Sequence, residues 1–134
     1  MSLSILYHPE FLNHNTGINH PENPHRLIAC INSLKNSPFS EYLEWKLPQP
    51  AKESQINWIH SKKYINHVKN ICNSGGGFLD PDTPVCCESF KIALLAAGAW
   101  LNGVDEIING NYAFILARPP GHHAEKNKAM GFCL

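Results

Sequence analysis

The chain has 134 residues, of which 43% are hydrophobic, a length and composition typical of one soluble globular domain or part of one. Its 11 basic and 11 acidic residues cancel, so the sequence lacks the basic surplus that direct nucleic-acid binding or a polybasic membrane contact requires. The five cysteines are odd in number and form no CxxC pair, which favours reduced thiols; with no leader or membrane-length apolar run, we expect a cytoplasmic protein.

The first part of the chain predicts a strand, a long loop, a helix and a second strand. Residues 3–7 are a short apolar run typical of a buried strand, and the polar stretch 8–23 predicts a loop of a length that often carries function. Asn23 supplies a helix cap, and apolar residues at helical spacing continue from there to about residue 37. The alternation of apolar and polar residues over 43–47 predicts a half-buried strand.

Two helices and an acidic loop are predicted next. A short helix is expected from Ser54 through residue 59, and a second begins at Ser61 and is broken by the glycine-rich run 73–77. The segment 78–84 contains two prolines, which exclude a regular helix or a central strand. It predicts a loop that carries two carboxylates.

A long helix and a strand follow. The helix is expected from Cys86 or Cys87 to Ile108, and its apolar stripe is expected to comprise Phe90, Ala93, Leu94, Ala97, Leu101, Val104 and Ile108. The continuous apolar run 112–117 predicts a strand that is covered on both faces. Strands that alternate with helices predict an α/β fold with a mostly parallel sheet flanked by helices, in which ligands bind beyond the carboxyl ends of the strands.

The segment RPPGHHA, residues 118–124, places two adjacent imidazoles on a stiff turn directly after that strand. One of the pair, His122 or His123, could act as a general base while the other orients a ligand. Two merely solvated histidines are the alternative, which the strand and the proline-glycine turn argue against. The eight histidines include no HExxH, HxH or i, i+4 ligand pair, so no metal ligand is assigned, and the other six are expected mostly at the surface or in loops.

Three segments together resemble the histone deacetylase superfamily, which includes acetylpolyamine amidohydrolases and acetoin-utilisation proteins. Residues 118–133, RPPGHHAEKNKAMGFC, are similar to its signature, and residues 8–9 with 19–27, and then 79–84, agree in order. They are most similar to the bacterial and class II-like branches. The resemblance implies an arginase/deacetylase-like three-layer fold, of which residues 1–134 would be the N-terminal part of a single domain, incomplete at its C-terminal side.

The resemblance also implies a reaction, the zinc-dependent removal of acetyl groups from acetyl-lysine peptides or acetylpolyamines. His123 corresponds to the general base that acts on a zinc-bound water, and His122 to the histidine that assists it electrostatically. In the family the zinc ligands, an Asp-x-His pair and a later Asp, would follow Leu134. Residues 1–134 are therefore expected to hold no zinc ligand and to be inactive alone.

Three other kinds of contact are implied by the same resemblance. Asp82, with Asp80 as a competitor, matches a rim carboxylate that accepts hydrogen bonds from substrate; a loop-capping role is the alternative. Gly131 and Phe132 match the wall of the tunnel that holds the acyl-lysine stem, although Phe132 could also be a core residue. Arg26 matches the arginine that lines the cavity for departing acetate; otherwise it is a cation on a helix surface.

Two other functions are compatible with the residues. A non-catalytic module could self-associate or bind another chain through an exposed sheet edge at the strand 112–117. A cysteine enzyme could use Cys133 beside His123, although a cysteine in that position is typically a small core residue.

Overall fold

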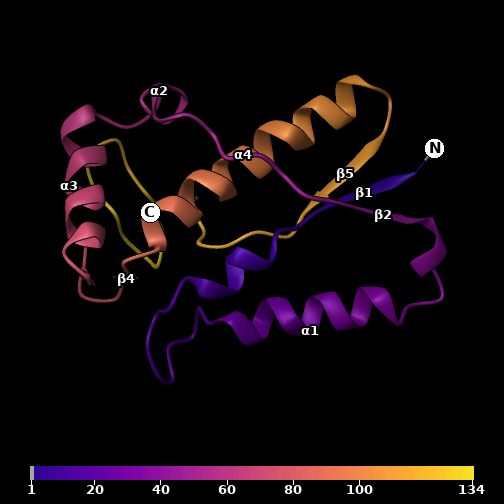
Figure 1. The fold of residues 1–134 in the computed structure, drawn as a ribbon, viewed down its shortest axis with the longest axis horizontal. Coiled ribbons are helices and arrows are strands. Elements are labelled where there is room, and N and C mark those ends of the chain that lie inside the picture. Colours follow the sequence, from indigo (N-terminus) through magenta and orange to yellow (C-terminus); the bar gives the residue numbers. More distant parts are fainter. Residues whose placement is uncertain (1) are drawn as a thin grey trace.

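The structure is a computed structural model that describes residues 2–134, and Figure 1 shows its course. Its main sheet has three parallel strands in the order β2-β1-β5: β1 is Leu3–Leu6, β2 is Leu43–Lys46 and β5 is Tyr112–Ile115. The register sets Ile5 of β1 level with Trp45 and Phe114. The predicted α/β fold with a parallel sheet is confirmed.

Two helices enclose this sheet. On one face α4 (Ser89–Ile108) packs against β5 and β1, and Ser4 of the central strand donates a hydrogen bond to Glu106 of α4. On the other face lies α1 (Pro24–Lys35), whose Lys35 ammonium sits 5.3 Å from the ring centre of Trp45. The core between them comprises Ile5, Leu6, Phe11, Leu27, Ile31, Ile92, Leu95, Ala96, Ala99 and Leu116.

A second, smaller unit stands at one end of α4 (Figure 1). It consists of α2 (Glu53–Ile56), α3 (Lys62–Asn73) and a hairpin of β3 (Gly76–Phe78) and β4 (Pro84–Cys86). The Ser61 hydroxyl caps α3 by accepting a hydrogen bond from the Tyr64 amide, as an N-cap serine should. A separate cluster of buried side chains joins this unit to the end of the chain: Tyr64, Val68, Cys72, Val85 and Ala129.

Several predicted boundaries were wrong in detail. The loop 8–23 contains a 3-10 helix, η1 (Pro9–Asn13), and a second one, η2 (Ser40–Tyr42), precedes β2. Residues 76–78 were expected to be irregular but pair with β4, because Gly76 adopts a positive φ that brings its backbone against Val85. Helix α2 starts at Glu53 rather than after a Ser54 cap, since the Lys52 amide is held by Gln55.

The apolar stripe predicted for α4 is not the face that the helix buries. The helix buries another face, formed by Ser89, Ile92, Leu95, Ala96, Gly98, Ala99 and Gly103. Glycine is needed at position 98, because a Cβ there would overlap the backbone of the segment 49–51. Because α4 is apolar on most of its circumference, hydrophobic periodicity could not decide which face meets the sheet.

Strand β5 is shorter and less covered than predicted. It ends at Ile115, and the side chains of Tyr112 and Phe114 are 59% and 49% exposed. These residues lie on the face of the sheet that α1 covers, and β5 forms one edge of the sheet among the described residues. All five cysteines are free, and no helix in the described part of the chain is long and apolar enough to cross a membrane.

Candidate active site

The histidine turn lies where the chain leaves the carboxyl end of β5. The rings of His122 and His123 are 4.3 Å apart between centroids and tilted by 55°, and both residues are exposed. The Leu134 amide donates a hydrogen bond to the Pro120 carbonyl, so the last described residue lies against this turn. The predicted pair is therefore present as a contacting pair of imidazoles.

Gly131 supplies the space that His123 occupies. Its φ is +58°, and a Cβ built there would lie 3.2 Å from Cδ2 of His123. Phe132, the next residue, also adopts the left-handed region with a φ of +70°, which is uncommon for a residue with a bulky side chain. The loop 130–133 thus touches the histidine turn directly.

The two candidate rim carboxylates lie at the tip of the β3–β4 hairpin. Asp82 is exposed, and its own amide donates a hydrogen bond to the Asp80 carboxylate. Hydrogen bonds from the backbone and side chain of Asp82 hold the pKa of Asp80 below its usual range. Asp80 therefore shapes the turn, as a capping residue does, which leaves the Asp82 carboxylate as the one that projects to solvent.

Phe132 meets the loop 8–23 through His20. The two rings are 4.8 Å apart between centroids at 76°, an edge-to-face contact. The Nε2 atom of His20 lies 3.1 Å from the Asp82 carbonyl oxygen. Because a carbonyl only accepts, this nitrogen carries the proton. The backbone of Phe132 is bound separately, since its amide donates to the hydroxyl of Thr83 at 3.1 Å.

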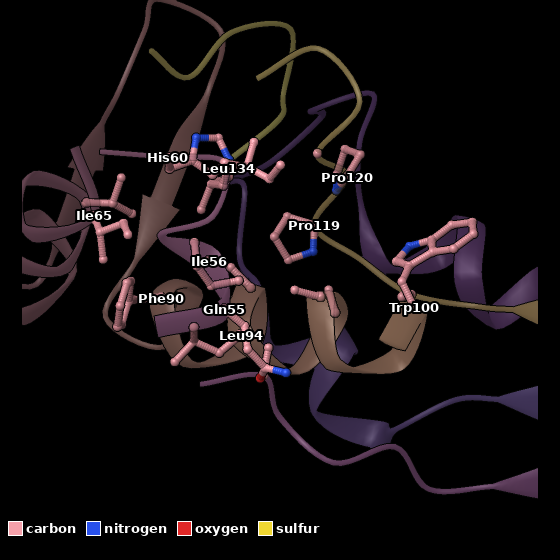
Figure 2. Close-up of a pocket in the computed structure, with 18 of the residues that line it drawn as sticks. Gln55, Ile56, His60, Ile65, Phe90, Leu94, Trp100, Pro119, Pro120 and Leu134 are labelled. Atoms are coloured by element: carbon pink, nitrogen blue, oxygen red, sulfur yellow. The ribbon is translucent and has the colours of Figure 1, made fainter. Parts of the chain in front are cut away.

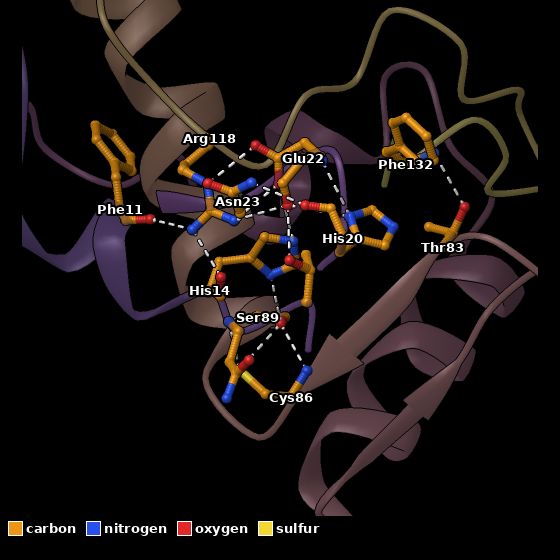
Figure 3. A network of polar contacts seen from close by, with 12 residues as sticks. Phe11, His14, His20, Glu22, Asn23, Thr83, Cys86, Ser89, Arg118 and Phe132 are labelled. Atoms are coloured by element: carbon orange, nitrogen blue, oxygen red, sulfur yellow. Dashed lines mark hydrogen bonds and ion pairs between the residues drawn. The ribbon is translucent and has the colours of Figure 1, made fainter. Parts of the chain in front are cut away.

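A buried ion pair lies beneath these groups (Figure 3). Arg118, the first residue of the histidine segment, forms a two-point contact with the Glu22 carboxylate, with Nε–Oε1 and Nη2–Oε2 distances of 3.0 and 2.8 Å. Its Nη1 donates to the carbonyls of Phe11 and His14. Both charged side chains are at least 96% buried, so nearly all the guanidinium donors must be satisfied by the protein itself.

His14 extends this pair toward α4. Its Nδ1 lies 2.7 Å from the Ser89 hydroxyl and its Nε2 lies 3.9 Å from the Glu22 carboxylate. Ser89 also accepts a hydrogen bond from the Cys86 amide. Burial, and then the charge of Arg118, lower the pKa of His14 to about 4, so the ring is neutral at neutral pH. We call Arg118, Glu22, His14 and Ser89 the arginine cluster.

Arg26 occupies a different position from Arg118. Its side chain is 68% exposed, and its closest ionic contact is the Glu22 carboxylate at 3.9 Å. Within the described residues it is therefore a surface cation, and the acetate-channel role stays a prediction. Cys133, by contrast, is fully buried, which argues against a cysteine nucleophile.

An apolar groove of about 660 Å³ borders the histidine turn on its other side (Figure 2). Its walls come from α2, α3, α4 and the turn, and they include Ile65, Phe90, Leu94, Trp100, Pro119 and His122. Five of the seven residues in the apolar stripe predicted for α4 line this groove: Phe90, Ala93, Leu94, Ala97 and Leu101. Tyr64 also lines it, and within residues 2–134 its hydroxyl is the one buried side-chain polar atom without a partner. Burial raises the pKa of Tyr64 to about 12.

The sequence did not single out most members of the arginine cluster. His14, like most of the unassigned histidines, was expected at the surface or in a loop; it lies in the loop 8–23 but is only 1% exposed. Glu22 and Arg118 lie in the segments 19–27 and 118–133 named in the sequence analysis. No local pattern, however, indicates that residues 96 positions apart form an ion pair. The signal available was the position of Arg118 directly after a strand end and before the turn.

Within residues 2–134 no group of three or more His, Cys, Asp or Glu side chains could hold a metal ion. The described residues therefore do not form a zinc site by themselves. The described residues bring together the imidazoles of His122 and His123, the exposed carboxylate of Asp82 and the aromatic ring of Phe132. All of these groups lie on loops beyond the carboxyl end of β5.

In an open α/β fold a ligand binds beyond the carboxyl ends of the strands, where the histidine pair lies, and comparison with known proteins defines the class of protein. Residues 20–134 match the family model described as "Histone deacetylase domain". The chain is 47% identical to an uncharacterized protein of Synechocystis sp. over 98% of this chain and 45% of that protein. It is 34% identical to a "Probable deacetylase" of Methanothermobacter thermautotrophicus over 97% of this chain and 38% of that protein. The chain belongs to the histone deacetylase family.

The fold agrees with this assignment. The crystal structure of the HDA15 HD domain superposes with a TM-score of 0.91 at 28% identity, over 99% of this chain and 40% of that one. The chain thus spans less than half the length of these relatives. The family supports a deacetylase-like amidohydrolase in general terms.

Proposed function

We propose that this chain is the part of a zinc-dependent deacetylase that handles protons and receives substrate. The observation that carries the proposal is the contact of His122 with His123 on the turn after β5, held against Gly131. Two adjacent imidazoles can divide proton transfer between them, one accepting a proton from the attacking water and the other returning one to the departing amine. His123 is proposed as the acceptor and His122 as its partner.

The proposed substrates are acetyl-lysine peptides or acetylpolyamines, both of which carry an acetyl-amide on a narrow aliphatic stem. Phe132 offers an aromatic wall for such a stem, and Asp82 offers an exposed carboxylate beside it. A carboxylate at the rim can accept hydrogen bonds from a peptide backbone or attract a polyamine ammonium group. The proposed zinc ligands lie outside residues 2–134, so the activity is proposed for a protein that also carries the remaining part of the domain.

A chimera tests this proposal. These 134 residues would replace the matched segment of the Synechocystis relative, whose 47% identity makes the new interfaces the best matched of the relatives described above. We expect zinc-dependent release of acetate from an acetyl-lysine peptide, with a loss of about 10²- to 10⁴-fold on His123→Ala. His67→Ala changes a histidine on α3 and serves as the matched control. An active chimera that keeps its rate after His123→Ala would contradict the assignment.

Self-association is a second candidate function, and a specific observation favours it. Strand β5 has an open edge in the described part of the chain, with Tyr112 and Phe114 exposed beside it. An uncovered parallel edge with apolar side chains is a template for pairing with another chain. Light scattering of the 134-residue protein decides the matter: a monomer at micromolar concentration would contradict this role.

A further inference from the structure

The groups proposed to contact substrate are joined by one buried hydroxyl, that of Thr83, and Figure 3 shows its contact with Phe132. Thr83 follows Asp82 in the hairpin and is 0% exposed. Its Oγ1 accepts a hydrogen bond from the Phe132 amide at 3.1 Å and donates one to Oδ1 of Asp82 at 3.3 Å. One oxygen atom therefore links the backbone of the proposed tunnel wall to the proposed rim carboxylate.

The backbone of Thr83 is fixed by hydrogen bonds at both its amide and its carbonyl. The Thr83 amide donates to the Asp80 carbonyl, and the Thr83 carbonyl accepts from the Leu79 amide, both at 3.0 Å. With its backbone bound twice and its side chain fully buried, Thr83 has little freedom to move away from Phe132. The hairpin thus presents a fixed acceptor to the loop 130–133.

Phe132 needs that acceptor because of its backbone conformation. A φ of +70° is unfavourable for a residue with a Cβ, so the surrounding contacts must maintain it. The amide that this conformation directs toward the hairpin has Thr83 as its partner. Without the hydroxyl, a partly buried N–H group would be left unpaired, which favours a different conformation of Phe132.

His20 completes a closed circuit around the rim. Its ring packs edge-on against Phe132, and its Nε2 donates to the carbonyl of Asp82. Asp82, Thr83, Phe132 and His20 therefore connect three chain segments, and each of the four residues touches two of the others. Such a circuit determines the distance between the rim carboxylate and the aromatic wall.

We infer that Thr83 is a positioning residue, whose hydroxyl fixes the distance between Asp82 and Phe132 and thereby the width of the substrate entrance. The inference rests on the proposed function, because it takes Asp82 and Phe132 as substrate contacts. Thr83 does not touch the histidine pair through any hydrogen bond of the structure. Its removal should therefore weaken substrate binding more than it slows the chemical step.

The first test uses the 134-residue protein and needs no activity. Thr83→Val keeps the shape of the side chain but removes the oxygen, whereas Thr83→Ser keeps the oxygen. By NMR we expect the Phe132 amide to exchange with solvent at least about tenfold faster in the valine variant and at the original rate in the serine variant. The Ala99 amide in the core of α4 should exchange equally in all three proteins. Unchanged exchange at Phe132 in the valine variant overturns the inference.

The second test uses the chimera described above. Thr83→Val should raise KM for the acetyl-lysine peptide by about tenfold and leave kcat within about twofold, and Thr83→Ser should restore KM. A fall in kcat at constant KM would overturn the inference. If the parent chimera is inactive, the proposed function fails, while the amide exchange still decides the link between Thr83 and Phe132.

A second variant tests the same inference if Thr83→Val does not fold. His20→Leu, at a half-buried position, removes the ring and its hydrogen bond and so opens the circuit from the other side. It should raise KM with the same small effect on kcat. Normal KM in a folded His20→Leu protein would contradict a circuit that controls the entrance.

Discussion

The two sides of the histidine turn are built on different principles. On one side lies the arginine cluster, in which a buried guanidinium, carboxylate and imidazole satisfy one another and the loop 8–23. On the other side lies the apolar groove, which is open and is lined in part by Tyr64, whose buried hydroxyl has no partner within residues 2–134. The first region is internally complete, whereas the second exposes apolar surface that would be stabilised by further contacts.

This difference assigns different tasks to the two regions. The arginine cluster ties Arg118, at the base of the histidine segment, to Glu22 in the long loop, so it positions the turn and the rim together. The groove contributes little to that geometry, since its lining side chains on α4 face away from the sheet. We therefore expect substitutions in the cluster to disturb the whole fold and substitutions in the groove to be tolerated.

The largest effect is expected from breaking the buried ion pair. Arg118→Met leaves the Glu22 carboxylate without its buried, hydrogen-bonded counter-charge and two loop carbonyls without a donor, and should lower the free energy of unfolding by about 3–5 kcal/mol. Urea denaturation followed by circular dichroism measures this. Arg26→Met is the matched control, because its exposed side chain lies 3.9 Å from the same carboxylate, and it should change stability by less than about 1 kcal/mol.

A double variant shows whether the loss of stability comes from the missing arginine itself or from the Glu22 charge that stays buried without it. The double variant Arg118→Met, Glu22→Gln removes both charges, so it should be more stable than Arg118→Met alone. If the double variant instead loses as much stability as Arg118→Met and Glu22→Gln added together, the two side chains act independently, and the broken ion pair does not explain the effect.

A matched pair of substitutions on α4 compares its two faces directly. Leu95 is buried between α4 and the sheet, whereas Leu101 lines the open groove. Leu95→Ala should lower the free energy of unfolding by about 2–5 kcal/mol, because it leaves a cavity in the core. Leu101→Ala should cost less than about 1 kcal/mol, since the site is open and alanine favours the helix. Equal losses for the two variants would show that the groove is closed in solution.

Local patterns predicted the main helices and the parallel strands of this fold, but not the hairpin of β3 and β4 and not the face that α4 buries. Capping residues such as Asn23 and Ser61, and the prolines around Asp82, act over a few residues, so their effects could be read from the sequence. The orientation of α4 depends on close backbone contacts, such as that of Gly98 with the segment 49–51, which no periodicity reveals.

The candidate site likewise contains residues that the sequence indicated and residues that it did not. The histidine pair stood out because two neighbouring residues carry it, and in the structure the centroids of their rings lie 4.3 Å apart. The groups around it come from distant positions: Thr83 bonds to Phe132 across 49 residues, and His14 contacts Ser89 across 75. Threonine and serine hydroxyls are common in loops, so their type alone gave no reason to select them.

The smallest of the expected effects concerns pH and the imidazole of the arginine cluster. His14 has a pKa of about 4 in the folded protein and about 6.5 when unfolded, so the unfolded state binds a proton that the folded state excludes. The stabilisation is therefore complete above about pH 6.5 and is lost as the pH falls toward 4. Between about pH 7.5 and 4.5 this residue should remove on the order of 2 kcal/mol of stability.

Comparison with His14→Asn isolates that contribution from the carboxylates, which titrate in both proteins. Asparagine places an amide near the position of Nδ1 and can still bond to Ser89, but it cannot take up a proton in this range. The variant should lose less stability than the parent over the same pH interval, by the same 2 kcal/mol or so. Parallel stability curves would mean that the ring has the same pKa in the folded and unfolded states. Below that pKa the arginine cluster would then hold two cations beside Glu22, an arrangement that burial makes unfavourable.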